Sequence, residues 1–188
     1  MIKFKFNEKK ATQATALLLK NNDGKMNYMK LIKLLYLIDR EALSLWERPI
    51  TGDTYVSMKR GPVLSNVLDL INYGENVSSY WYKYISEPLN YELRLRECDP
   101  GQDLLNEKEI EIINQIGDQF KDFNQWEMVE LCHEMLPEWR DPGTNTCSEI
   151  HINDIFNAIR PKSDEELKEI EEEVNNLAYL KEVLAIED

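Results

Sequence analysis

The sequence predicts an α+β fold: a predominantly α-helical single domain with a small antiparallel sheet and an acidic C-terminal helix. Three observations carry this prediction. Apolar residues recur at helical spacing through most of the 188 residues. Short segments rich in Tyr, Val and other β-formers interrupt that spacing at two places. No sequence repeat and no Gly/Ser/Pro-rich linker divides the chain.

The first 74 residues are predicted to form three helices and one strand. The first helix ends at Asn21-Asn22-Asp23-Gly24, a strong breaker, and Asn27 caps the second. Apolar residues cover most of the circumference of that second helix, which therefore lies in the middle of the fold. Pro62 is expected at the first position of the third helix, where its missing N–H costs nothing. The expected elements are helix 8–20, helix 28–46, turn 48–53, strand 54–59 and a helix from 61–62 to 73–74.

The second part of the chain is predicted to form a hairpin followed by four helices. The aromatic cluster around Trp81 is expected to pack across the hairpin, and a stacking platform for bases is the disfavoured alternative. Asn106 and Asn124 each precede a Glu three residues later, as in a capping box. The expected elements are hairpin 79–97, helices 106–121, 124–136 and 151–159, and a last helix opened by Ser163-x-x-Glu166. The chain thus divides into a domain, 1–162, and an acidic helix, 163–188.

The net charge of −13 opposes sequence-independent binding to nucleic-acid phosphates, so no direct DNA binding is expected. The charge is uneven: residues 1–60 carry +6 and residues 61–188 carry −19. Docking of the two halves is the favoured explanation, and a basic face for an acidic partner or RNA stays open. The longest apolar run, Leu34 to Ile38, is too short to cross a bilayer, and no secretory h-region begins the chain. We therefore expect a cytoplasmic protein without membrane contact.

Candidate catalytic and metal-ligating residues are few. His133-Glu134 is not a zincin motif, because Pro137 stands where the second histidine belongs. The three cysteines form no Cys-x-x-Cys pair, so neither a metal nor another cofactor is expected. Charges near residues 39–41 are expected to form a structural ion-pair cluster with the 51–53 turn, Lys59 and Arg60. An acid/base enzyme using Asp39, Asp53 and His133 is kept only as an alternative.

The last helix carries a narrow apolar stripe among many glutamates. Such a stripe packs on the parent domain, pairs with a second copy, or binds another protein. Packing on the parent domain is favoured by a small margin, and partner binding and self-association are left open. The residues of this possible partner helix are Leu167, Ile170, Val174 and Leu177.

An ordered series of motifs resembles the Panacea domain, the SocA-like antitoxin family. The series consists of Leu34-Leu35-Tyr36, Asp39-Arg40-Glu41, Arg48-Pro49-Ile50-Thr51-Gly52-Asp53 and Met58-Lys59-x-Gly61-Pro62-Val63-x-Ser65. Later come Val129-Glu130-Leu131-x-His133, Trp139 and Ser148-Glu149-Ile150. The resemblance covers roughly residues 12–160. Leu64 departs from the pattern, where family members often have a second proline.

The resemblance implies a non-enzymatic bacterial or phage antitoxin of a type II toxin–antitoxin system, whose partner is a toxin encoded by a neighbouring gene. The alternatives are a proteolytic adaptor that delivers a bound protein to a protease, and an orphan phage-associated binding module. The residues that match the family pattern either contact the partner or hold the domain. They are Asp39, Arg40, Asp53, Lys59, Gly61, Pro62, Ser65, His133 and Trp139.

Overall fold

A computed structural model describes residues 2–73 and 79–184. Within these residues it confirms a predominantly helical α+β fold with a small antiparallel sheet. The helices are α1 (Glu8–Lys20), α2 (Tyr28–Trp46), α3 (Ser65–Tyr73), α4 (Ser79–Tyr84), α5 (Glu107–Gln119), α6 (Gln125–Met135), α7 (Ile152–Ile159) and α8 (Asp164–Val183). The strands are β1 (Lys25–Asn27), β2 (Tyr55–Met58), β3 (Gly61–Leu64), β4 (Glu92–Arg94) and β5 (Cys147–Ile150).

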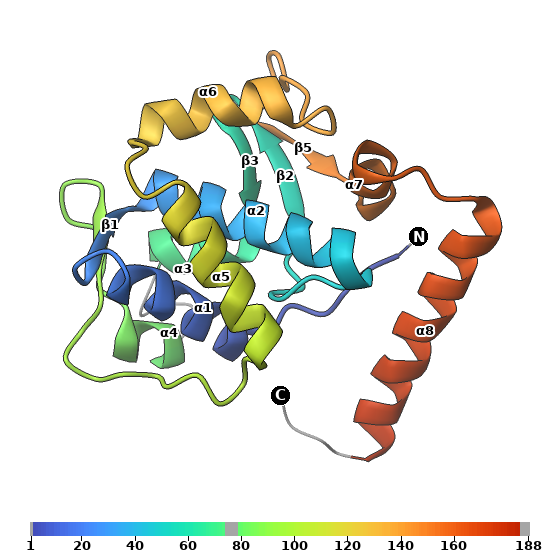
Figure 1. The fold of residues 1–188 in the computed structure, drawn as a ribbon, viewed down its shortest axis with the longest axis horizontal. Coiled ribbons are helices and arrows are strands. Elements are labelled where there is room, and N and C mark those ends of the chain that lie inside the picture. The colour runs from blue at the N-terminus through green and yellow to red at the C-terminus, as the bar shows by residue number, and fades with distance from the viewer. Residues whose placement is uncertain (1, 74–78, 185–188) are drawn as a thin grey trace.

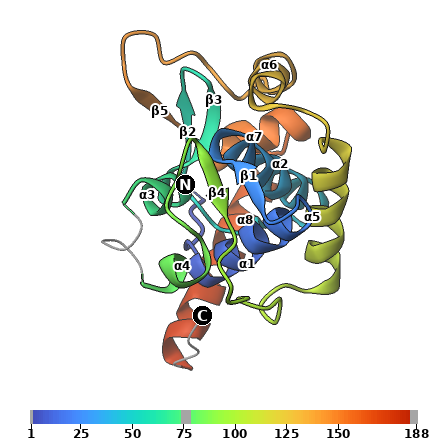
Figure 2. The ribbon, with the colours of Figure 1, turned by 90° about the vertical axis from the view of Figure 1, so that its left-hand side faces the viewer.

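Helix α2 occupies the middle of the domain, as its nearly all-apolar sequence predicts. Figures 1 and 2 show α1, α5, α6 and β3 packed around it, and each of these elements contacts α2. Leu31, Leu34, Leu35 and Ile38 are completely buried. Burial of such side chains contributes roughly 1.5–3 kcal/mol each, so α2 is the element on which the others assemble.

The strands form two antiparallel sheets. In the three-stranded sheet β2 lies between β3 and β5, with Tyr55 opposite both Leu64 and Ile150. In the two-stranded sheet β1 pairs with β4, and Met26 lies opposite Leu93. The larger sheet joins the turn at Lys59-Arg60 to the segment that follows α6.

The expected helix at Gly61–Pro62 is wrong for its first four residues, which form β3. The segment turns back at Lys59-Arg60 and pairs with β2, so that Ser57 lies opposite Pro62. A proline that cannot donate to a ladder is tolerated there because β3 is an edge strand. The helix begins only at Ser65.

The expected hairpin over 79–97 is also wrong, because residues 79–84 form helix α4. Trp81 is 1% exposed, and Tyr80 packs edge-on against Tyr84 one helical turn later with ring centroids 5.0 Å apart. The strand β4 pairs with β1 instead of with this segment. The chain does double back over residues 85–95, with bridges between Ile85 and Leu95 and between Leu89 and Glu92, so the hairpin is shorter than expected.

Residues 2–7 cross the turn that follows α2. The Asn7 N–H donates to the Thr51 carbonyl at 2.9 Å. A Cβ on Gly52 would stand 2.3 Å from the Lys5 carbonyl oxygen, and Gly52 has φ +68°. Only glycine fits this crossing, so the start of the chain is part of the same fold.

Helix boundaries agree with the capping residues found in the sequence. Asn27 caps α2, Asn106 and Asn124 form full capping boxes on α5 and α6, and the Ser163–Glu166 box opens α8. The strand β5 was not expected from the sequence. The division into residues 1–162 and 163–188 stays a prediction.

Candidate partner-binding site

Asp39 is the most deeply buried residue of the predicted set. Its carboxylate accepts hydrogen bonds from the Ile50 N–H at 2.8 Å, the Thr51 N–H at 2.9 Å, the Thr51 hydroxyl and the Tyr55 hydroxyl at 2.9 Å. Burial raises the pKa of Asp39 to about 6, although these four donors favour the charged form. The carboxylate is thus fully occupied in holding the 50–55 segment against α2.

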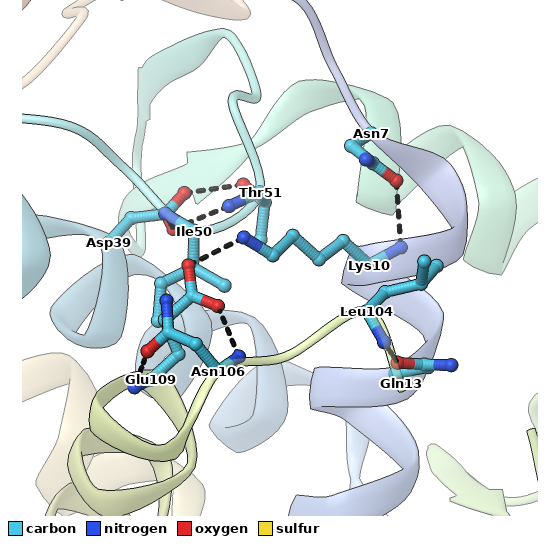
Figure 3. Close-up of polar contacts among 9 residues, drawn as sticks. All are labelled: Asn7, Lys10, Gln13, Asp39, Ile50, Thr51, Leu104, Asn106 and Glu109. Atoms are coloured by element: carbon cyan, nitrogen blue, oxygen red, sulfur yellow. Dashed lines mark hydrogen bonds and ion pairs between the residues drawn. The ribbon is translucent and has the colours of Figure 1, made fainter. Parts of the chain in front are cut away.

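Figure 3 shows this cluster beside a second one that joins α1 to α5. Lys10 extends to Glu109 with an Nζ–Oε1 distance of 2.5 Å, and the same glutamate accepts from the Asn106 N–H at 3.0 Å. Asn7 connects the clusters, because its side chain caps α1 at the Lys10 N–H while its own N–H donates to Thr51. The polar groups around Asp39 form an internal frame and do not open onto a surface.

Asp53 caps α3 from outside the helix. Its carboxylate accepts from the Asn66 N–H at 2.9 Å, the Asn66 amide at 2.8 Å and the Val67 N–H at 3.0 Å. The Ser65 N–H donates to the Thr54 carbonyl at 2.8 Å, and the Ser65 side chain is half-buried. Burial raises the pKa of Asp53. Both predicted aspartates therefore hold parts of the domain together.

Of the expected cluster, the link between α2 and the 51–53 turn is present, but Lys59 and Arg60 are not part of it. Asp39 binds the turn and Tyr55, and Arg40 pairs instead with Glu138, at 2.7 Å between Nε and Oε1. Glu138 has no exposed side-chain surface and also accepts from the Tyr36 hydroxyl at 2.9 Å. No local pattern indicates this pair, because Glu138 lies 98 residues beyond Arg40 in a loop between Pro137 and Trp139.

Beneath Gly61 and Pro62 lies a buried lysine that sequence reasoning missed. Lys33 donates to the Pro62 carbonyl at 2.7 Å. A Cβ on Gly61, which has φ +97°, would stand 3.1 Å from the Lys33 Nζ and 3.3 Å from the Cys132 Cβ. Burial lowers the pKa of Lys33 to about 8 and raises the pKa of Cys132 to about 11. The signal available was a lysine within the most apolar stretch of the chain.

His133 and Trp139 lie together at the end of α6. Their rings stack with centroids 4.0 Å apart and planes 13° apart. The Trp139 indole N–H donates to the Met58 carbonyl at 3.0 Å, which fixes the loop after α6 to β2. Partial desolvation and the nearby Lys33 charge lower the pKa of His133, so its neutral form is favoured.

One exposed surface does carry motif residues, and we call it the hairpin–α6 face. It combines the β2–β3 turn with one side of α6, where residues 126, 130 and 133 share a helix face. The Arg60 guanidinium lies 5.1 Å from the centroid of the half-exposed Trp126 ring. The members of this face are Lys59, Arg60, Trp126, Glu130 and His133.

The structure thus distributes the nine predicted residues over α2, the turn after it, the β2–β3 connection with β3, the start of α3, and the end of α6 with its following loop, and exposes few of them. Lys59 and His133 are exposed, whereas Asp39, Asp53, Gly61 and Pro62 are buried. Within residues 2–73 and 79–184 no three His, Cys, Asp or Glu side chains gather as a metal site would require. In the same part of the chain no helix has the length and apolarity to cross a membrane.

The apolar stripe on α8 packs mainly on the parent domain, which is the alternative favoured from the sequence. Leu167, Ile170 and Val174 face the domain, with Ile170 6% exposed and the other two packed against the core. Leu177, the fourth residue, is 36% exposed. Three of the four side chains are therefore already covered.

Comparison with known families agrees with the resemblance that the motif residues indicated. Residues 31–140 match the family model described as antitoxin SocA-like, Panacea domain, and this segment contains all nine motif residues. Comparison with curated proteins and with solved structures gave no match. The matched segment is more than half of the 188 residues and includes β2, β3, α6 and most of α2. The chain therefore belongs to the SocA-like antitoxin family and carries its Panacea domain.

Proposed function

We propose that this protein is the antitoxin of a type II toxin–antitoxin pair, and that it silences a toxin from a neighbouring gene by binding it directly. Family membership supports an antitoxin role. In such a pair only the complexed toxin is silent, so neutralisation follows from affinity and the ratio of the two proteins. The protein acts without catalysis, in the cytoplasm.

The non-enzymatic part of the proposal rests on the burial of the two motif aspartates, whose carboxylates bond to other parts of the domain. An enzyme needs a nucleophile or base that can reach a substrate. Here Asp39 and Asp53 each accept several hydrogen bonds from the chain itself and are at most 5% exposed. Two of the three residues from which an acid/base enzyme would be built, Asp39 and Asp53, thus hold a turn and a helix start, and the third, His133, stacks on Trp139. We propose that the motif is a scaffold and that other, exposed side chains contact the toxin.

The first test is growth of cells that express each neighbouring open reading frame with and without this protein. We expect one neighbour to arrest growth, and this protein to restore growth and co-purify with that product. Two variants test the scaffold proposal. Asp53→Asn should weaken rescue only as far as it lowers the amount of folded protein. The triple variant of Asp39, Asp53 and His133 to Asn, Asn and Gln separates catalysis from folding when its soluble level is measured beside its rescue.

The amount of the toxin in the rescued cells distinguishes binding from proteolytic delivery. Direct neutralisation leaves the toxin present at an undiminished level, whereas an adaptor lowers it. Loss of rescue in a variant that stays folded and keeps binding the toxin would indicate catalysis and contradict the proposal. If no neighbour arrests growth, the type II antitoxin assignment of this chain is wrong.

A further inference from the structure

Helix α8 has two halves with different surroundings. Residues 164–174 are anchored on the domain by Ile170, by Leu167 and Val174, and by an ion pair between Glu173 and Arg48. Just before the helix, Lys162 pairs with Glu47 at 2.5 Å. These contacts hold the start of α8 to the end of α2.

The described side chains of residues 175–180, 183 and 184 lack such burial, and they include a group of large apolar ones. Leu177 is 36% exposed, and the others range from 49% to 64%. Figures 1 and 2 both show this end of α8 extending past the body of the domain. A helical segment of this length is marginal in water without packing, and contiguous exposed apolar surface marks an interaction site. The group consists of Leu177, Tyr179, Leu180, Val183 and Leu184.

The exposed side of α8 changes character along its length. At about 100° per residue, Glu165, Glu169 and Glu172 lie on the side of the helix opposite the anchored stripe. Leu180 and Val183 continue that same side two to three turns further on. All five side chains are exposed. One face therefore presents carboxylates first and apolar groups second.

We propose that this face of α8 docks onto a basic protein, in an apolar groove that is bordered at one end by Lys or Arg side chains. Leu180 and Val183, with Tyr179 beside them, enter the groove, and the glutamates face the basic border. Helix-in-groove recognition uses anchors spaced three and four residues apart, the spacings of Val183 from Leu180 and from Tyr179. The inference rests on the proposed function where it takes this partner to be the toxin, and it adds the chemistry of the toxin surface.

Charge decides between this occupant and a second copy of the chain. Helix α8 carries eight acidic and two basic side chains. Parallel pairing of two copies would set the glutamate rows against each other. Antiparallel pairing would place the glutamates of one copy over Leu180 and Val183 of the other, where carboxylates lose water without gaining a partner. Lys or Arg side chains at the border of a partner's groove would pair with the glutamates whichever way α8 runs along the groove. Nucleic acid is disfavoured as the occupant, because its phosphates carry the same charge as the glutamates.

Photo-crosslinking in the native host cells tests the proposal while the partner is still unidentified. The full chain is made with p-benzoylphenylalanine at position 179, at position 172, or at Tyr91, an exposed tyrosine 70% accessible on a distant part of the chain. We expect position 179 to crosslink to an apolar segment, and position 172 to a neighbouring Lys/Arg-rich segment of the same protein. The Tyr91 position should not give this product.

Binding of the crosslinked partner, purified, then measures the two parts of the face. Leu180→Ser/Val183→Ser should raise Kd at least about tenfold through faster dissociation. Glu165→Gln/Glu169→Gln/Glu172→Gln should slow association about tenfold at low salt and flatten its salt dependence. The matched control removes three exposed carboxylates elsewhere, through Glu111→Gln, Asp118→Asn and Glu134→Gln, and should change binding little. Thermal melts confirm that each variant is folded.

The outcomes separate this inference from the proposed function. Absence of a crosslink at position 179, a crosslink to a second copy of this chain, or an acidic segment at position 172 overturns the docking face. Growth rescue in the presence of any of these results leaves the antitoxin function intact. A basic partner that is crosslinked but does not arrest growth supports the docking face and contradicts the toxin assignment.

Discussion

Helices α2 and α8 have nearly equal lengths, 19 and 20 residues, and use their charged side chains in opposite ways. In α2 the charged Lys33 and Asp39 are buried, and each is bonded to a backbone or side-chain partner within the domain. In α8 most of the charges are solvated and the apolar end is exposed. Charges of the first kind specify how the chain folds, whereas charges of the second kind leave the fold nearly unaffected and suit a partner.

The extent of the family match follows the same division. Residues 31–140 contain most of α2 and many of the elements packed on it, and α8 lies outside the match. A shared scaffold with a separate contact element would let one fold meet partners of different chemistry. Three predictions, from the largest expected effect to the smallest, test whether α2 and α8 differ in this way.

The largest effect is expected at Asp39. Asp39→Ala removes the acceptor of four buried hydrogen bonds and should lower the free energy of unfolding by on the order of 3–5 kcal/mol. Asp39→Asn should recover part of this loss, because its carbonyl can accept from the two backbone N–H groups while its amide donates to Thr51 and Tyr55. Urea denaturation measures both.

The control for Asp39 is Glu41→Ala, an exposed neighbour on the same helix, which should change stability by less than about 0.5 kcal/mol. A cost at Asp39 as small as that at Glu41 would show that the internal frame does not hold the 50–55 segment. The distinction between α2 and α8 would then have no energetic basis.

A smaller effect is expected within α8 itself. Ile170→Ala empties a buried position and should cost about 2 kcal/mol. Leu180→Ala removes a side chain that is 49% exposed and should cost less than about 0.5 kcal/mol. Chemical denaturation of the two variants, made in the same full chain, gives the comparison. Equal losses would mean that residues 175–184 pack on the domain and are not free to dock elsewhere.

Long elements with consistent periodicity were predictable from the sequence. Helix α2 and its central place follow from apolar residues on most of its sides, and the Asn caps marked the starts of α2, α5 and α6. Short segments were not predictable in this way. Gly61–Leu64 suits a helix start and an edge strand equally, and the pairing with β2 decided it. Around Trp81, burial of one helical face outweighed an alternating pattern.

The candidate site shows the same limit. The family motif indicated Asp39, Arg40 and Asp53 as important, but it left open whether they contact a partner or hold the domain. Their bonding groups come from other segments, Glu138 for Arg40 and Asn66 for Asp53, and no local pattern encodes such pairs. Lys33 was missed because a single lysine in an apolar helix is compatible with the end of its long side chain reaching solvent.

The smallest expected effect is the pH dependence that Lys33 gives to the free energy of unfolding. Between pH 7 and pH 9 the unfolded chain keeps this lysine protonated, since its ordinary pKa is 10.5, while the folded chain loses the proton near its pKa of about 8. The unfolded state then binds more protons, so this group makes the folded state more stable as pH rises. Its contribution between pH 7 and pH 9 is about 1.4 kcal/mol.

Lys33→Met should remove this slope, so that any stability advantage of the variant at pH 7 shrinks by about 1.4 kcal/mol at pH 9. The lost donor to the Pro62 carbonyl adds a cost that does not depend on pH. Urea denaturation at both pH values measures the difference, with Lys168→Met on the exposed side of α8 as the control for loss of a lysine. Above pH 9 the buried Cys132 thiol, whose pKa is raised to about 11, acts in the opposite direction, so the comparison stops there.

A difference that stays constant would mean that water reaches the Lys33 ammonium in the folded chain. The close approach of Gly61 and Cys132 argues against such access, because both pack beside the ammonium where it donates to the Pro62 carbonyl.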